Sequence, residues 1–195
     1  KFYMVWSNYN DNFWFSRYYE KMKKLIVLTP LTLLFLICGF FIIYLTSDKD
    51  PNMPPSALLD KEMPFFKGVS LYNSNQIITS KELKDKKILI NFFASWCVPC
   101  KIEHPLFFDL SENFSELYIL GINHKDPQQE AIAYLDNEGN PYNFVAVDKD
   151  GSIALEFGVF GLPETFLIDN NGKIIFKFMG PLTKEIINNE IEPLL

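Results

Sequence analysis

The sequence predicts one α/β domain, built on a mixed central sheet with helices on both faces, preceded by a single transmembrane helix. Residues 25–45 form an uncharged apolar run of 21 residues, close to the roughly 20 residues that a helix needs to cross a bilayer. In the 150 residues that follow, short apolar runs alternate with amphipathic stretches and turn residues. That length is enough for one compact domain with its own core.

These observations divide the chain into a cytoplasmic segment at 1–24, an anchor at 25–45, a proline-rich linker at 46–61 and a folded domain at 62–195. Residues 1–20 are rich in aromatic side chains and do not begin with methionine. We interpret them as an over-called translation start. The alternative is an interfacial cytoplasmic segment, because Trp and Tyr favour the membrane boundary.

The charges divide across the apolar run. Before it, five basic residues face two carboxylates, a net charge of +3, and after it 13 lysines face 22 carboxylates, a net charge of −9. Because basic residues beside a hydrophobic segment stay in the cytoplasm, we expect a single-pass membrane protein with its C-terminal domain outside the cytoplasm. The acidic outer domain argues against nucleic acid as a partner, since phosphate binding requires basic side chains.

The apolar run has two other interpretations. A cleaved signal peptide has a shorter apolar core and a small-residue cleavage site, and no convincing site precedes Ser47. Cys38 invites a lipoprotein interpretation, but Ile37 stands where lipid attachment requires a small residue. We therefore expect an uncleaved anchor.

The folded domain shows an alternation of strand and helix patterns. Apolar runs of strand length predict strands at 64–71, 76–79, 88–94, 117–122, 144–147, 165–168 and 174–179. Helical patterns predict helices at 102–114, 127–137, 152–157 and 184–191, with a helical turn at 80–83. We expect Asp126 to begin the second of these helices, and the first two and last two strands to form hairpins. A mixed sheet in this order, with helices on both faces, is the thioredoxin fold.

Cys97 and Cys100 stand between a buried strand and a helix. Residues three apart on a first helical turn share a face, so the two sulfurs can form a disulfide. The helix dipole and unpaired backbone N–H groups stabilise a thiolate at Cys97. Cys100 lies one turn further in, so we expect it to be covered and to attack second. The pattern therefore predicts thiol–disulfide exchange.

Other uses of a C-x-x-C pair fit less well. A structural disulfide across so short a loop removes little chain entropy. A zinc site would need two more ligands, and only His104 and His124 are available. A haem attachment site requires histidine where Lys101 stands. We therefore expect redox chemistry, with no metal and no cofactor.

The stretch N-F-F-A-S-W-C-V-P-C-K at 91–101 and G-V-F-G-L-P-E-T-F-L-I-D at 158–169 resemble the membrane-tethered thioredoxins of cytochrome c maturation, the CcmG/DsbE family. The resemblance continues through Glu-His-Pro at 103–105, Gly-Ile-Asn-His-Lys-Asp at 121–126 and Gly-Asn-Pro-Tyr at 139–142. It covers most of the outer domain at the expected spacings, and the single N-terminal anchor agrees with it. The resemblance implies a single-pass protein of the inner membrane with its C-terminal domain in the periplasm.

The resemblance implies roles for residues around the cysteine pair. Pro163 corresponds to the cis proline of thioredoxin folds, which turns the backbone of Leu162 outward, where a substrate segment could add as a strand. Glu103 and Glu164 correspond to acidic residues near the disulfide, where carboxylates raise thiol pKa values or act as local bases. We predict catalytic roles for Cys97, Cys100, Pro163, Glu164 and Glu103, and substrate contacts for Trp96, Val98, Pro99 and Leu162.

One position departs from general thioredoxins. They carry a buried Asp six residues before the first cysteine, and this sequence has Asn91 there. Because a neutral amide cannot accept the proton of Cys100, we expect that task to pass to Glu103, Glu164 or water.

The resemblance also implies partners. The expected substrate is the cysteine pair of apocytochrome c, reduced before haem attachment, and the expected electron donor is a membrane protein of the DsbD/CcdA type. A general extracytoplasmic reductase is the main alternative. A copper-handling protein of this fold, using Cys97, Cys100 and His124, is the third possibility.

Overall fold

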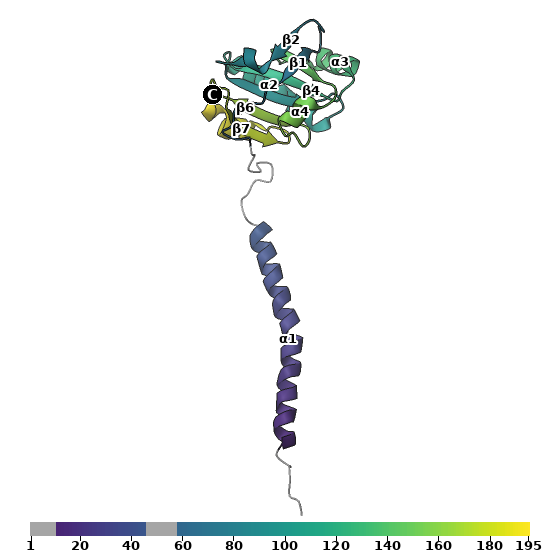
Figure 1. Cartoon of the computed structure of the whole chain (residues 1–195), viewed down its shortest axis with the longest axis vertical. Helices are drawn as coiled ribbons and strands as arrows, with labels where there is room; N and C mark the ends of the chain where they lie inside the picture. The colour runs from purple at the N-terminus through teal and green to yellow at the C-terminus, as the bar shows by residue number, and fades with distance from the viewer. Residues whose placement is uncertain (1–10, 46–57) are drawn as a thin grey trace, which may run out of the picture. The chain divides into compact units, whose positions relative to one another are not determined.

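The computed structural model describes residues 11–45 and 58–195, which belong to two separate parts of the chain (Figure 1). The first part is the helix α1 (Asp11–Leu45). Its stretch Tyr18–Tyr44, 27 residues long, is apolar and extended enough to cross a membrane, a property that anchors and signal sequences share. Most of the predicted linker, at 46–57, lies outside the described residues.

The second part is built on a seven-stranded mixed sheet in the order β2-β1-β5-β4-β3-β6-β7. The strands are β1 (Lys67–Ser70), β2 (Ile77–Thr79), β3 (Ile88–Phe93), β4 (Tyr118–His124), β5 (Phe144–Asp148), β6 (Glu164–Ile168) and β7 (Ile174–Met179). Strands β3, β4 and β5 are parallel, and the other pairings are antiparallel. The predicted thioredoxin arrangement is confirmed, and the N-terminal hairpin extends the sheet because β1 pairs with β5.

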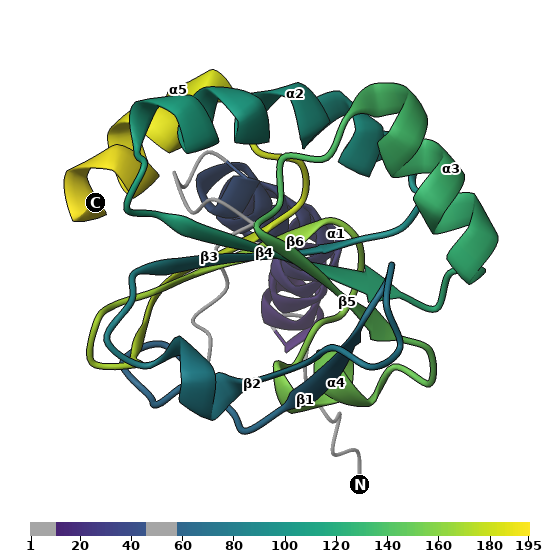
Figure 2. The same ribbon diagram turned by 90° about the horizontal axis from the view of Figure 1, so that it is seen from above.

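Helices cover both faces of this sheet. Figure 2 shows α2, α3 and α5 over one face and α4 on the other. Their bounds are α2 (Val98–Asn113), α3 (Gln128–Glu138), α4 (Ser152–Glu156) and α5 (Lys184–Ile186), with η1 (Ser80–Leu83), η2 (Ile187–Ile191) and η3 (Glu192–Leu194). The helix predicted at 102–114 begins four residues earlier, directly after Cys97. The last predicted helix passes from α to π to 3-10 geometry along its length.

Two apolar clusters form the core, one on each face of the sheet. The cluster under α2, α3 and the C-terminal helices includes Phe107 and Ile187. On the α4 face, the rings of Phe92, Phe157 and Phe166 pack with centroids 5.3–5.7 Å apart. Every residue of β3 is buried, as expected for a strand covered on both faces. This rigid strand delivers the chain to the cysteine pair.

The start of α3 differs from the prediction. Asp126 does not begin the helix, because Pro127 occupies the N-cap position and no side chain caps it. The Asp126 carboxylate accepts hydrogen bonds from the backbone N–H of Ser95 at 2.6 Å, the Ser95 hydroxyl at 2.8 Å and the Asn123 amide at 2.8 Å. Asp126 therefore joins the loop after β4 to the loop before Cys97 instead of capping α3.

Candidate active site

Cys97 and Cys100 form a disulfide at the N-terminus of α2, with their Cα atoms 5.3 Å apart. Cys97 is the N-cap residue, and its sulfur accepts a hydrogen bond from the backbone N–H of Cys100 at 3.2 Å. Pro99 stands in the first turn, where its missing N–H removes no helical hydrogen bond. Both cysteines are buried, with 4% and 3% of their surface exposed. In the disulfide form, burial therefore does not distinguish the first attacking cysteine from the second. Their positions on the helix do.

The loop before the cysteines is held by the loop that follows β4. In addition to the bonds between Ser95 and Asp126, the Trp96 indole N–H donates to the carbonyl of Lys125 at 3.3 Å. Phe93 and Asn123 are paired in register at the ends of the parallel strands β3 and β4. Polar residues at or just after the ends of two such strands meet at one edge of a sheet, a signal that could have assigned Asn123 and Asp126 to this site from the sequence.

A cis peptide bond joins Leu162 to Pro163, as the resemblance implied. Strand β6 runs antiparallel to β3, with Glu164 opposite Phe92. The start of β6 therefore lies beside the end of β3, and Pro163 stands at the same edge of the sheet as Cys97. The structure thus brings the predicted proline and the cysteine pair together.

The predicted substrate-contact residues differ in exposure. Trp96 and Val98 are exposed, at 58% and 68%, and Pro99 and Leu162 are half-buried. Two further apolar side chains at this edge were not predicted: Ile102, one turn after Val98, and Phe160, which is 85% exposed. Large exposed apolar groups on the chain segments that carry the cysteine pair and lead into the cis proline are typical of a contact surface.

Glu103 lies in the interior between α2 and the sheet. One carboxylate oxygen accepts from the Asn91 amide at 2.8 Å and the other from the backbone N–H of Leu182 at 2.7 Å. Burial raises the pKa of Glu103 to about 8, although both hydrogen bonds oppose that rise. Asn91 also accepts from the Tyr142 hydroxyl at 2.9 Å. The amide that replaces the thioredoxin Asp therefore bonds directly to the buried acid three residues after Cys100.

Glu164 is also buried, but it faces a cation. Its Oε1 lies 2.7 Å from the Lys177 ammonium, and its Oε2 accepts from the backbone N–H of Phe160 at 3.0 Å. Burial raises the pKa of Glu164, and the ammonium and the loop N–H groups oppose the rise. Among the described residues, neither Glu103 nor Glu164 hydrogen-bonds to a cysteine sulfur.

Both histidines have a partner within the domain. His124 lies 2.8 Å from the carboxylate of Asp148, which also accepts two backbone N–H groups of α4. His104 hydrogen-bonds to the carbonyl of Gly139 at 3.0 Å, and burial lowers the pKa of His104. Within the described ranges, no group of three or more His, Cys, Asp or Glu side chains gathers to hold a metal ion.

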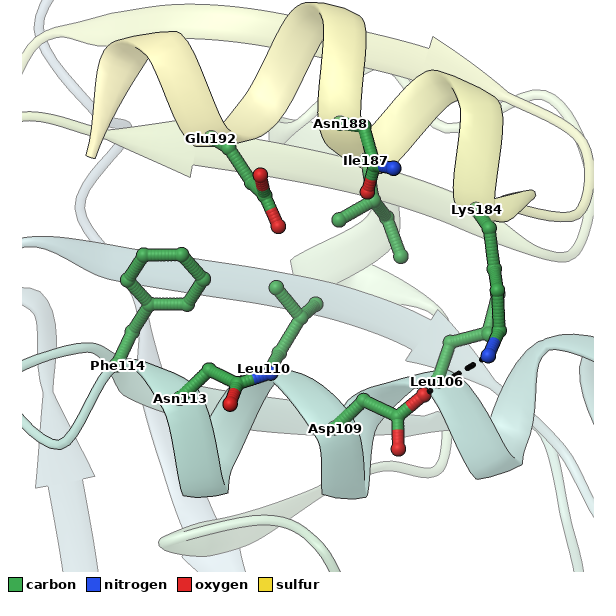
Figure 3. Close-up of a pocket in the computed structure, with 9 residues that line it drawn as sticks. All are labelled: Leu106, Asp109, Leu110, Asn113, Phe114, Lys184, Ile187, Asn188 and Glu192. Atoms are coloured by element: carbon green, nitrogen blue, oxygen red, sulfur yellow. Dashed lines mark ion pairs between the residues drawn. The ribbon is translucent and has the colours of Figure 1, made fainter.

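A cavity of about 200 Å³ lies between α2 and the C-terminal helices (Figure 3). Lys184 and Asp109 form an ion pair at 3.5 Å across one end of it. Its lining comes from the second half of α2 and from α5, η2 and η3, and includes none of the predicted site residues.

The fold and this edge of the sheet define a class. A thioredoxin-type domain with a disulfide-bonded C-x-x-C pair at a helix N-terminus, beside a cis-proline strand start, is a dithiol–disulfide exchange protein. The Redoxin family model matches residues 59–194.

Similar proteins narrow the class. The thiol:disulfide interchange protein HelX of Rhodobacter capsulatus is 38% identical over 89% of this chain and 97% of its own length. The thiol:disulfide interchange protein DsbE of Escherichia coli K12 is 37% identical over 89% of this chain and 95% of its own. The crystal structure of a DsbE-type protein of Chlorobium tepidum matches with a TM-score of 0.60 at 25% identity, over 70% of this chain and 96% of that one. The chain belongs to the DsbE/HelX family of thiol:disulfide interchange proteins and is a thiol–disulfide oxidoreductase.

Proposed function

We propose that this protein reduces the disulfide of an apocytochrome c C-x-x-C-H motif before haem attachment, while anchored in the inner membrane with its domain in the periplasm. The observation that carries the proposal is the Cys97–Cys100 disulfide at the start of α2. The close relationship to DsbE and HelX proteins and the apolar helix α1 support it.

The reaction begins with the protein in its dithiol form. The Cys97 thiolate attacks one sulfur of the substrate disulfide, forms a mixed disulfide and releases one substrate thiolate. The Cys100 thiolate then attacks the Cys97 sulfur, restores the Cys97–Cys100 disulfide and expels the second substrate thiolate. Two electrons pass from the protein to the substrate, and a membrane thiol transporter of the DsbD/CcdA type supplies the next two.

Glu103 is the residue that we assign to proton transfer at Cys100. It stands three residues later on α2, so the two side chains share a helix face. Its pKa of about 8 makes the carboxylate a base of suitable strength for a thiol near neutral pH. Pro163 and Leu162 provide the backbone edge for the substrate, and Trp96, Val98 and Pro99 surround the reacting sulfur.

Trapping tests the client. Cys100→Ser cannot resolve the mixed disulfide, so it should hold partners on Cys97 in membranes, where mass spectrometry identifies them. Cys97→Ser with Cys100→Ser is the matched control and should trap none. Recovery of apocytochrome c would support the proposal. Many unrelated secreted proteins would instead indicate a general reductase.

Membrane attachment is tested separately. The full chain should stay in the membrane pellet after alkaline carbonate extraction, and protease added from the periplasmic side should digest the domain. Release of the domain by carbonate would contradict the anchor and indicate a cleaved signal sequence.

A further inference from the structure

The loop at 158–162 leads into the cis proline, and two buried charges hold it. The Lys177 ammonium donates to the carbonyl of Gly158 at 3.0 Å. At the other end, Glu164 accepts from the backbone N–H groups of Phe160, at 3.0 Å, and of Gly161. The ammonium and the carboxylate contact each other at 2.7 Å, so the two ends of the loop are joined through one ion pair.

The pair is fully interior. The Lys177 side chain is 5% exposed and that of Glu164 is not exposed at all. The Lys177 ammonium also lies over two aromatic rings, 5.0 Å from the centroid of Phe166 and 5.7 Å from that of Phe160. Lys177, in the middle of β7, therefore contacts the Gly158 carbonyl and the Phe160 ring of this loop as well as the Glu164 carboxylate.

Stability alone does not explain such a pair. Replacing a buried ion pair with apolar side chains of similar volume is often neutral or stabilising, because desolvation offsets the attraction between the charges. Lys177 stands between Phe176 and Phe178 on a strand of the apolar core, where an apolar residue would pack. What an apolar residue could not do is bond to the Gly158 carbonyl and to Glu164.

The held loop carries the most exposed aromatic side chain of the domain's active-site edge. Phe160 is 85% exposed, yet its own N–H is fixed by Glu164 and its ring lies near Lys177. A large apolar side chain held in place at the surface loses less conformational entropy when a partner covers it.

We propose that Lys177 is a positioning residue for polypeptide substrates: through Gly158 and Glu164 it fixes the loop that presents Phe160 and the backbone of Leu162 beside the cysteine pair. The inference rests on the proposed thiol–disulfide function and adds how a polypeptide is distinguished from a small disulfide. Lys177 touches neither the cysteines nor, in this proposal, the reacting atoms.

The test compares Lys177→Met and Lys177→Arg with the wild type, as full-length reduced protein in detergent. Three substrates are used: an oxidised C-x-x-C-H peptide, insulin, and the small aromatic disulfide dithionitrobenzoate. In single-turnover reactions, in which each reduced protein molecule reduces one disulfide, Lys177→Met should lower the second-order rate constant for both polypeptides at least tenfold more than for the small disulfide, mainly by raising the half-saturating substrate concentration. Lys177→Arg, which keeps the charge, should restore most of the loss. Lys173→Met, at an exposed lysine of the preceding turn, is the control and should match the wild type.

The same substrate preference should arise without touching the ion pair. Phe160→Ala removes only an exposed ring, so the protein should fold normally and still lose polypeptide reduction selectively. When Phe160→Ala is combined with Lys177→Met, the double variant should lose no more polypeptide reduction than the stronger single variant, because both changes act on the same loop. An equal loss of the second-order rate constant for all three substrates, or no loss, would overturn the proposal. If Lys177→Met does not fold, Glu164→Gln with Lys177→Met, which removes both charges, takes its place.

Failure of the proposed function gives a different result. A wild type that reduces insulin but not the C-x-x-C-H peptide would contradict the apocytochrome client, while the ratio of insulin to small-disulfide rates still tests Lys177. A wild type that reduces none of the three would contradict the redox function itself.

Discussion

Replacing Glu103 with glutamine removes a buried carboxyl group whose folded pKa, about 8, lies far above its ordinary value of 4.5. Between these values the unfolded chain has lost the proton and the folded chain keeps it, so stability should fall as pH rises from about 4.5 to 8 and then level off. Each pH unit between the two pKa values lowers the free energy of unfolding by about 1.4 kcal/mol, so the loss reaches about 5 kcal/mol at and above pH 8. Solvent does not screen this carboxyl group, because the Glu103 side chain is fully buried.

Glutamine imitates the protonated acid. It has the shape of that acid, but its NH2 group cannot accept a hydrogen bond, so either the Asn91 amide or the Leu182 N–H loses its acceptor. Glu103→Gln should therefore be about 1–3 kcal/mol less stable than the wild type near pH 5, change little with pH, and exceed the free energy of unfolding of the wild type at pH 8 and above. Glu190→Gln, at an exposed carboxylate, is the control and should keep the wild-type decline.

The assay is reversible urea unfolding of the oxidised full chain in detergent, followed by tryptophan fluorescence at half-unit pH steps from 5 to 9. If the wild type and Glu103→Gln declined in parallel, Glu103 would titrate alike in the folded and unfolded states, and the argument from burial would be wrong. The same variant should also slow resolution of the mixed disulfide, since the proposed base is gone.

Three further predictions concern the residues that hold the site. Asp126→Ala removes three hydrogen bonds from a buried carboxylate and should cost about 3 kcal/mol in urea unfolding; an unchanged midpoint would contradict its role. Phe166→Ala leaves a cavity beneath β6 and should cost about 3–5 kcal/mol, whereas Phe65→Ala, at an exposed ring, should cost little. Glu164→Gln strands the Lys177 ammonium in the interior and should cost about 3–5 kcal/mol. Adding Lys177→Met should restore most of that loss, and a further loss in the double variant would show that the pair is not coupled.

Local signals predicted most of the fold. The β3 run is apolar at nearly every position, and an Asn-Gly turn separates β6 from β7. These features fix a buried central strand and a hairpin without knowledge of distant contacts. The pairing of β1 with β5 is not a local feature, because residues such as Val69 and Val147 meet only in the folded sheet. The sequence therefore predicted the hairpin, but not its partner strand.

The functional site likewise combines local features that the sequence predicts with long-range contacts that it does not. The spacing of Cys97 and Cys100 and their place before a helix were enough to predict exchange chemistry. Lys177 was not predicted, because an isolated lysine between two phenylalanines gives no sign that it faces Glu164 across the β6–β7 hairpin. The sequence pattern predicts a helix cap at Asp126, because a pattern cannot show that Ser95, 31 residues earlier, donates to this carboxylate.

The two buried acids have different surroundings, and this difference separates their tasks. Glu103 faces only neutral partners, Asn91 and the Leu182 N–H, so burial leaves its carboxyl group close to the point of proton exchange at neutral pH. Glu164 faces the Lys177 ammonium, so its charge is balanced where it stands. A group that must move a proton needs a pKa near the working pH, whereas a group that must hold a loop needs a constant charge. These two buried carboxylates can thus serve the chemistry and the substrate separately, because only one of them has a cation beside it.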